Sequence, residues 1–178
     1  MKQAVRYGFI LGIICFLASA VLAIVDAVTE PNIKIQQAKE EKAALEEVFP
    51  EAAIFKPRLS QEEVLYFLAY DKDNKLLGFV IKAQAKGYSS EIETLASLNL
   101  NLNIRQVKVL SQNETPGLGS RIAMDSFTGR FAGKNLAGLN DVQAITGATI
   151  SSGAVIKSIK DKLAGLNEQL TRETNNGK

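Results

Sequence analysis

The sequence predicts an α+β protein in which one N-terminal transmembrane helix precedes a compact extracytoplasmic domain, an antiparallel sheet packed by helices. Three observations lead to this expectation. The first segment is apolar and uncharged, the middle contains paired runs of strand-forming residues, and the last long segment repeats apolar residues every three or four positions. A length of 178 residues allows one membrane segment and one domain with a core of its own.

The apolar N-terminal segment, residues 7–25, contains no charged residue. As a helix it would reach about 28 Å, close to the hydrocarbon thickness of a bilayer. Lys2 and Arg6 precede the segment and acidic residues follow it. The positive-inside rule therefore predicts a single-pass protein of the cell (inner) membrane, with residues 1–6 as a cytoplasmic tail and the main domain extracytoplasmic.

A cleaved signal peptide is the alternative for this segment, because Ala18-Ser19-Ala20 has the small residues of a cleavage site. The apolar stretch runs past that site to Val25, which favours an uncleaved anchor. Gly8 and Gly12 form a G-x-x-x-G face that would let a second membrane helix approach closely, a hint of membrane partners.

Residues 26–50 are expected to form a stalk or the first helix of the domain. The run Thr29-Glu30-Pro31-Asn32 should break the membrane helix. Residues 33–49 are rich in alanine, glutamate and lysine, so they should form a second helix, which Pro50 ends. Acidic pairs in this helix are typical of a solvated face and do not indicate catalytic carboxylates.

Four strands are expected in the domain, which we assign to residues 51–168. Residues 64–70 and 76–81 are apolar, rich in aromatic and β-branched residues, and flank a polar turn, which predicts a hairpin. Residues 92–98 and 104–110 predict a second pair of strands joined across an asparagine-rich turn.

The remainder of the chain is expected to be helical or irregular. A helix is predicted over residues 121–131 and a loop over 133–140. The final helix carries an apolar stripe that includes Ile159 and Leu163 and should pack on the sheet. Residues 169–178 are expected to be a frayed polar tail.

Composition excludes several classes of chemistry. The chain has no histidine and a single cysteine, so it cannot by itself supply thiolate-ligated iron–sulfur clusters, histidine-ligated haem, ordinary zinc sites or a Ser-His-Asp triad. We expect no metal site and no catalytic residue. Redox chemistry would need an organic cofactor. A formal charge of +2 without a basic stripe argues against nucleic acid as a partner.

The run Thr146-Gly147-Ala148-Thr149, followed by Ile150-Ser151-Ser152-Gly153, leads into the final helix and is the most informative stretch of the chain. Its small side chains leave the backbone open, and Thr149 would stand beside the unpaired N–H groups of a helix N-terminus, where a phosphate could bind. The alternative is a helix cap, because Thr149 and the serines after it are all good N-cap residues.

A second block, Glu114-Thr115-Pro116-Gly117-Leu118-Gly119, follows the fourth predicted strand. Pro116 fixes one backbone angle and the glycines permit unusual ones, so this loop could hold N–H groups and Leu118 against a flat ligand. A tight turn into the next helix is the alternative. A dinucleotide-binding G-x-G-x-x-G is a weak interpretation, because its third glycine position is Ile122 and no βαβ unit surrounds it.

The two blocks resemble the S/T-G-A-T flavinylation motif and the E-T-P-G-L-G loop of FMN-binding subunits of membrane electron-transport complexes. Together with the membrane span and the length, they make the chain similar to the G subunits of Rnf-type ferredoxin:NAD oxidoreductases. The C subunits of sodium-pumping NADH:quinone reductases are the close alternative. The resemblance implies that Thr149 carries FMN through a phosphodiester bond, attached by a flavin transferase that draws on FAD.

The resemblance also implies a role and a set of site residues. The chain would relay electrons within an ion-translocating oxidoreductase, beside other membrane subunits, with no complete active site of its own. The loop holding Tyr88 resembles a segment near the flavin, although Tyr88 on sequence grounds alone fits a packing or surface residue better. The implied cofactor-binding residues are Tyr88, Glu114, Thr115, Pro116, Gly117, Leu118, Gly119, Thr146, Gly147, Ala148, Thr149, Ile150, Ser151 and Ser152.

One position departs from the family pattern. Gln143 stands where the family often has an aspartate, and Asp141 lies two residues further back. If the transferase reads that carboxylate, modification would be slower or would depend on Asp141. Two other functions stay open: a cofactor-free, membrane-anchored binding or assembly module, which would be colourless, and a stand-alone flavoprotein, which would not co-purify with membrane partners.

Overall fold

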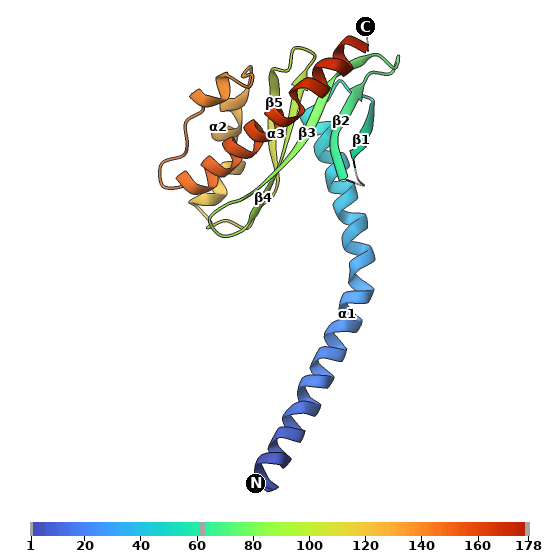
Figure 1. The fold of residues 1–178 in the computed structure, drawn as a ribbon, viewed down its shortest axis with the longest axis vertical. Helices are drawn as coiled ribbons and strands as arrows, with labels where there is room; N and C mark the ends of the chain where they lie inside the picture. Colours follow the sequence, from blue (N-terminus) through green and yellow to red (C-terminus); the bar gives the residue numbers. More distant parts are fainter. Residues whose placement is uncertain (1, 61–62, 177–178) are drawn as a thin grey trace. The chain divides into compact units, whose positions relative to one another are not determined.

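A computed structural model describes residues 2–60 and 63–176 of the chain. The chain divides into two compact units, residues 1–40 and residues 41–178. Helix α1, Lys2–Val48, runs through the first unit and ends inside the second (Figure 1). The second unit holds the sheet and the remaining helices, so it carries the fold and the candidate site.

The first unit is the N-terminal part of α1, which is long and apolar enough to cross a membrane. Its large apolar side chains point outward; Phe9, Phe16 and Leu22 are each about two-thirds exposed or more. An unbroken apolar surface of this size would be unstable in water, so it needs lipid or another apolar helix around it.

The predicted helix break at Thr29-Glu30-Pro31-Asn32 is wrong, because α1 continues through Pro31. Pro31 lacks the N–H that would donate to the carbonyl of Ala27, which weakens this turn. The side-chain amide of Asn32 donates to the carbonyl of Val28 at 3.5 Å, and the residues on both sides favour helix. The helix expected over residues 33–49 is therefore the continuation of α1.

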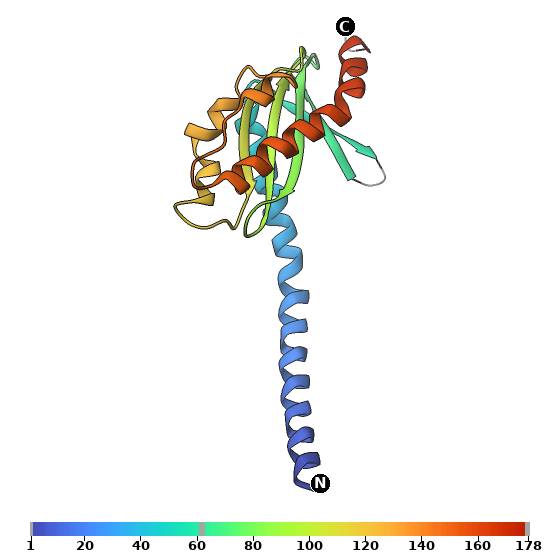
Figure 2. The same cartoon turned by 60° about the vertical axis from the view of Figure 1, so that its left-hand side comes forward.

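The expected antiparallel sheet is confirmed and has five strands in the order β1-β2-β3-β4-β5 (Figures 1 and 2). All neighbouring strands are antiparallel, and four of the five correspond to the predicted strands. The strands are β1 Ile54–Ser60, β2 Glu63–Tyr70, β3 Leu76–Lys86, β4 Glu91–Asn99 and β5 Ile104–Ser111.

Short side chains fix two of the turns. The Asp71 carboxylate accepts the N–H groups of Asp73 and Lys75 at 2.9 and 2.8 Å, which closes the turn between β2 and β3. The Asn99 side chain accepts two N–H groups in the same way between β4 and β5. Both are turns in which Asp or Asn replaces a backbone acceptor, as the polar runs predicted.

Strand β1 was not expected from the sequence. Pro57 and the charged residues on each side of it interrupt any apolar alternation. Because β1 is an edge strand with a single neighbour, a proline can occupy it without removing a ladder hydrogen bond on its open side.

Each face of the sheet packs against a helix. Ile81 on one face joins a core with Ile159 and Leu163 of α3, Thr149–Asn176, which confirms the predicted packing of the final helix. Leu95 on the other face joins a smaller core with Phe49 and the last turns of α1. The end of α1 is therefore the first helix of the domain.

Two further expectations differ from the structure. The region predicted as one helix over residues 121–131 is three short pieces, η1 Gly119–Ala123, α2 Asp125–Thr128 and η2 Gly129–Phe131, because Met124 has extended backbone angles. The predicted loop over residues 133–140 contains the start of the short helix η3, Gly138–Asp141.

The tail predicted to be frayed is helical as far as Asn176. Leu170 continues the apolar stripe of α3 and is fully buried. Arg58 of β1 forms an ion pair with Glu173 at 2.9 Å, which also fixes the end of the helix.

Candidate functional site

A cavity of about 510 Å³ lies where three loops meet at the N-terminus of α3. One wall comes from the turn after β3, a second from the loop after β5, and the third from the start of α3. The lining residues are Tyr88, Glu114, Thr115, Leu118, Gly119, Gly147, Ala148, Thr149, Ile150 and Ser151.

Most of the site residues expected from the sequence line this one cavity. Two blocks separated by about thirty positions in the sequence thus meet in space, together with Tyr88. Pro116, Gly117, Thr146 and Ser152 do not line the cavity. Pro116 and Gly117 form the turn of the second block, where the Gly117 N–H donates to the Ser120 hydroxyl at 2.9 Å.

Ser152 fixes the start of α3 from inside. Its hydroxyl donates to the carbonyl of Ala148 at 2.7 Å and accepts the N–H of Ile145 at 3.0 Å, and the side chain is fully buried. Gly147 has a φ of +83°, a left-handed conformation that glycine adopts without strain. These contacts turn the chain sharply into the helix and present Thr149 at its first position.

The Thr149 side chain is exposed at the edge of the cavity. Within the described part of the chain its hydroxyl has no hydrogen-bond partner. Thr149 begins the helix and does not cap it with its side chain, which argues against the simple capping hypothesis. The N–H groups of the first helical turn have no acceptor within α3, so this end of the helix attracts an anion.

Three apolar side chains surround the cavity and remain largely accessible. Tyr88 is 69% exposed, Ile150 59% and Leu118 50%. No lysine or arginine is among the described lining residues. A ligand here would meet flat apolar surfaces and backbone N–H groups, an arrangement suited to an aromatic ring system joined to one negative charge.

Glu114 is the buried charged residue behind this surface and is only 5% exposed. Its carboxylate accepts the backbone N–H groups of Tyr88, Ser89 and Ser90 at 3.0 to 3.1 Å. It also accepts the hydroxyl of Ser151 at 2.5 Å. A single side chain therefore connects all three walls of the cavity.

Two opposing effects act on the pKa of Glu114. Burial raises the pKa, because it penalises the charged form. The hydrogen bonds from Ser151 and the three N–H groups outweigh burial and hold the pKa below its ordinary value. The carboxylate is thus ionised and fully engaged with the protein, so we assign it to positioning the cavity walls and not to contacting a ligand.

The loop and the helix can approach closely because position 119 is glycine. A Cβ atom there would lie 2.8 Å from the Glu114 Cβ and 3.0 Å from the Ser151 hydroxyl oxygen. Any larger residue would push the loop away from α3 and separate the two walls of the cavity.

The sequence did not predict the contacts that Ser89 and Ser90 make with Glu114. Both donate backbone N–H groups, which every residue but proline carries, so residue identity could not reveal these bonds. The Ser90 hydroxyl adds a contact to Glu114 at 3.5 Å and accepts the N–H of Asn113 at 2.7 Å.

Gln143 stands where the family often has an aspartate, and its backbone carbonyl accepts a hydrogen bond from the Arg130 side chain at 2.8 Å. Gln143 and Asp141 are both exposed, open to an outside enzyme.

Replacing Ser152 with alanine should destabilise the domain by about 1 to 3 kcal/mol, because the N–H of Ile145 would be left buried without an acceptor. Urea unfolding would measure the loss. The matched control is Ser158→Ala on the same helix, whose hydroxyl donates to a carbonyl one turn earlier. An equal effect from the two substitutions would show that Ser152 has no special role.

Comparison with known proteins agrees with this geometry. Residues 87–164 match the FMN-binding domain family, and residues 1–48 match the family of RnfG N-terminal regions. The first match covers the whole cavity, from Tyr88 to the start of α3.

Three relatives match over most of their length. The G subunit of an ion-translocating oxidoreductase complex from Methanosarcina acetivorans is 32% identical, over 89% of this chain and 92% of the relative. The G subunit of a proton-translocating ferredoxin:NAD(+) oxidoreductase complex from Clostridium ljungdahlii is 31% identical, over 92% and 90%. The corresponding subunit of a Na(+)-translocating complex from Acetobacterium woodii is 30% identical, over 89% of each chain.

A solved structure shares the fold. The crystal structure of NqrC from Shewanella oneidensis aligns with a TM-score of 0.52 at 18% identity, over 70% of this chain and 74% of that one. At this identity the likeness concerns the arrangement of sheet and helices.

Proposed function

The chain belongs to the family of G subunits of ion-translocating oxidoreductase complexes, and we propose that it carries FMN covalently on Thr149 and relays electrons inside such a complex. Membership makes it a subunit of an oxidoreductase with an FMN-binding domain and with other subunits as partners. The covalent linkage, its residue and the enzyme that forms it are the proposal.

One observation carries the proposal: the Thr149 hydroxyl is exposed and unpaired among the described residues, at the mouth of a cavity and at a helix N-terminus. A phosphodiester on this oxygen would place one negative charge beside the N–H groups at the start of α3. The Ser152 N–H already donates to the Ala148 carbonyl at 2.9 Å, whereas those of residues 149–151 have no acceptor within the helix. Such a charge is typically stabilised there by about 0.3 to 1 kcal/mol at an exposed site.

The attachment step would be a phosphoryl transfer from FAD. The Thr149 oxygen forms a bond to the flavin-side phosphorus, the bond from that phosphorus to the bridging oxygen breaks, and AMP leaves while the hydroxyl proton passes to a base. This chain has no histidine, and no carboxylate of the cavity lining other than the fully engaged Glu114 could take the proton. This supports a separate flavin transferase as the source of the base.

The cavity fits the rest of the cofactor. Its volume of about 510 Å³ lies within the range of ordinary ligand pockets, and exposed Tyr88, Leu118 and Ile150 offer faces for a flat ring. The bound isoalloxazine would supply the redox chemistry, accepting and releasing electrons one or two at a time. Tyr88, Leu118 and Ile150 of this chain would hold and orient the ring.

The orientation in the membrane is also part of the proposal. Lys2 and Arg6 stand before the apolar segment, so the positive-inside rule supports a cytoplasmic N-terminus and an extracytoplasmic second unit. Protease added to intact spheroplasts should then digest the second unit, and its protection would reject this orientation.

Mass analysis of the natively matured protein tests the linkage. After digestion, the peptide that contains residues 146–152 should carry the mass of FMN less one water, and its flavin fluorescence should survive denaturation. Matured protein without this adduct, or with the adduct on another peptide, would contradict the assignment. Expression without the transferase provides the unmodified reference.

A further inference from the structure

A second and larger cavity, of about 920 Å³, lies on the same unit away from the flavin site. It shares no lining residue with the cavity at Thr149. The end of β3 and one side of α3 form most of it, with contributions from α1 and β2. The lining residues are Glu41, Val64, Lys82, Ala83, Gln84, Ala85, Lys86, Ala154, Lys157, Ser158, Asp161 and Lys162.

The cavity exists because β2 separates from β3. The pairing of these strands reaches from Tyr70 only to Tyr66, which lies opposite Ile81. Beyond that point β3 continues to Lys86 and pairs with β4 alone. Figure 2 shows the β1–β2 hairpin turning away from the rest of the sheet. In the described pairings, residues 82–86 thus form a free strand edge inside the sheet.

The pattern of hydrogen bonds shows which backbone groups face this gap. The Gly87 N–H donates to the Ser90 carbonyl at 2.8 Å, and the Ala83 carbonyl accepts the Thr94 hydroxyl at 3.3 Å. Because an antiparallel ladder alternates, residues 81, 83 and 85 direct their N–H and C=O groups to β4. Those of residues 82, 84 and 86 point into the gap.

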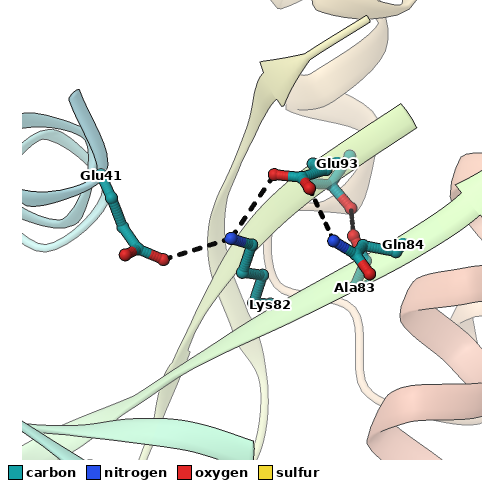
Figure 3. A network of polar contacts seen from close by, with 6 residues as sticks. Glu41, Lys82, Ala83, Gln84 and Glu93 are labelled. Atoms are coloured by element: carbon teal, nitrogen blue, oxygen red, sulfur yellow. Dashed lines mark hydrogen bonds and ion pairs between the residues drawn. The ribbon is translucent and has the colours of Figure 1, made fainter. Parts of the chain in front are cut away.

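The side chains beside this edge are held away from it (Figure 3). The Lys82 amino group lies 3.4 Å from Glu41 and 3.4 Å from Glu93 of β4. The Gln84 amide donates to the same Glu93 at 2.6 Å. Both side chains therefore lie over the face of the sheet, and the backbone edge stays accessible to another strand.

The charges around the gap are mainly positive. Four lysines and two carboxylates line it, and the carboxylate of Glu41 is engaged with Lys82. Lys86, Lys157 and Lys162 have no ion pair among the described residues. A second copy of the same basic edge would be repelled, whereas an acidic strand would be attracted.

We propose that this gap receives an extended, acidic segment of another subunit of the complex, which adds as a strand to residues 82–86 of β3. Backbone groups of Lys82, Gln84 and Lys86 would pair with the segment, and its carboxylates would meet the lysines of α3 and Lys86. Lysines also protect edge strands from aggregation. That role alone does not account for a strand pair that separates to leave a cavity of this size.

Amide hydrogen exchange with single-residue resolution tests the proposal, because it reads the backbone groups themselves. The comparison is between the full chain alone in detergent and the same chain in the purified complex. The amides of residues 82, 84 and 86 should exchange at least about tenfold more slowly in the complex. Those of residues 81, 83 and 85, which face β4, should change little and are the internal control.

Charge reversal provides a second readout. Lys157→Glu with Lys162→Glu should remove the added protection and lower the amount of chain recovered with the complex by about tenfold. The matched control reverses two exposed lysines in the turn between β2 and β3, Lys72 and Lys75, and should leave both measurements unchanged. Circular dichroism and urea unfolding that match the wild type in both variants would show that they fold.

Three results would overturn the proposal. Equal exchange in the isolated chain and in the complex would mean that no strand is added. Protection produced by vesicles of anionic phospholipid alone would assign the lysines to a lipid surface. Protection that grows with the concentration of the isolated chain would assign the edge to a second copy. Each result is independent of whether Thr149 carries FMN, because the proposal rests only on membership of the complex.

Discussion

Replacement of Thr149 by alanine is expected to abolish covalent flavin attachment and to leave the domain folded. The hydroxyl is the proposed attachment atom, so its removal leaves nothing to esterify. The side chain is exposed and unpaired among the described residues, and alanine is the best helix former, so the free energy of unfolding should change by less than about 0.5 kcal/mol. In-gel fluorescence, intact mass and urea unfolding measure the two effects.

Two variants control this experiment. Thr149→Ser keeps a hydroxyl at the same position and should retain some attachment. Thr146→Ala removes the other threonine of the same block, which is exposed but does not line the cavity, and should keep full attachment. A fluorescent, mass-shifted Thr149→Ala protein would refute the linkage. Loss of flavin from Thr146→Ala would mean that the transferase reads the block and not the single hydroxyl.

Loss of the tether should also stop electron transfer through the complex. A covalently held flavin stays between fixed redox neighbours, whereas a free one diffuses away. Complex assembled with Thr149→Ala is therefore expected to lose most of its electron-transfer activity, while its subunit composition stays the same. An unchanged subunit composition would show that the activity is lost because the flavin is missing and not because the complex fails to assemble.

Local chemistry allowed much of the fold to be predicted. Four strands followed from runs of aromatic and β-branched residues between polar turns, and α3 followed from its apolar stripe. The start of α3 was also visible, because small and hydroxyl-bearing residues before an amphipathic run mark a helix N-terminus. In each case the neighbours in sequence decide the structure.

The elements that the sequence did not predict depend on parts of the chain beyond their immediate neighbours in sequence. Pro31 predicts a break, yet α1 continues, because the helix-forming residues on both sides outweigh the one hydrogen bond that proline removes. Strand β1 has no alternation of apolar and polar residues that would predict it, and it forms because it pairs with the edge of β2. Leu170 stabilises the end of α3 through the core, a contact that composition near the C-terminus cannot indicate.

The residues of the candidate site could be predicted from the sequence, but the hydrogen bonds that hold the walls of the cavity together could not. Both blocks were singled out from the sequence, and both line the cavity. Glu114 was expected to bind the cofactor, whereas its carboxylate is fully occupied by three backbone N–H groups and Ser151. Only the folded chain reveals this, because the donors come from a loop that lies more than twenty positions earlier.

Replacement of Glu114 by alanine is expected to destabilise the domain by about 3 to 5 kcal/mol, because the buried N–H groups of Tyr88, Ser89 and Ser90 would lose their acceptor. That loss approaches the whole stability of a small domain. Glu114→Gln is the informative partner, because its one carbonyl oxygen can still accept two of the N–H groups. Glu114→Gln should lower the free energy of unfolding by about 1 to 3 kcal/mol at pH 7.

The difference in the free energy of unfolding between wild type and Glu114→Gln should become smaller as the pH falls. Hydrogen bonds hold the pKa of Glu114 in the folded chain below its ordinary value of about 4.3, so the unfolded chain binds the proton more tightly. The stability due to ionised Glu114 is therefore complete above about pH 4.3 and is lost as the pH falls through the lowered folded pKa. Glutamine has no such dependence.

Urea unfolding of both proteins at pH 7 and at pH 3 measures this effect. Other carboxylates with a lowered pKa, such as Glu51, are present in both proteins and cancel in the comparison. The gap in stability should narrow at pH 3, because the Glu114 carboxyl of the unfolded chain binds a proton there, which favours unfolding of the wild type and not of the glutamine variant. A gap that stays constant between the two pH values would mean that charge is irrelevant at this position. Glu114 would then support the cavity by its shape alone.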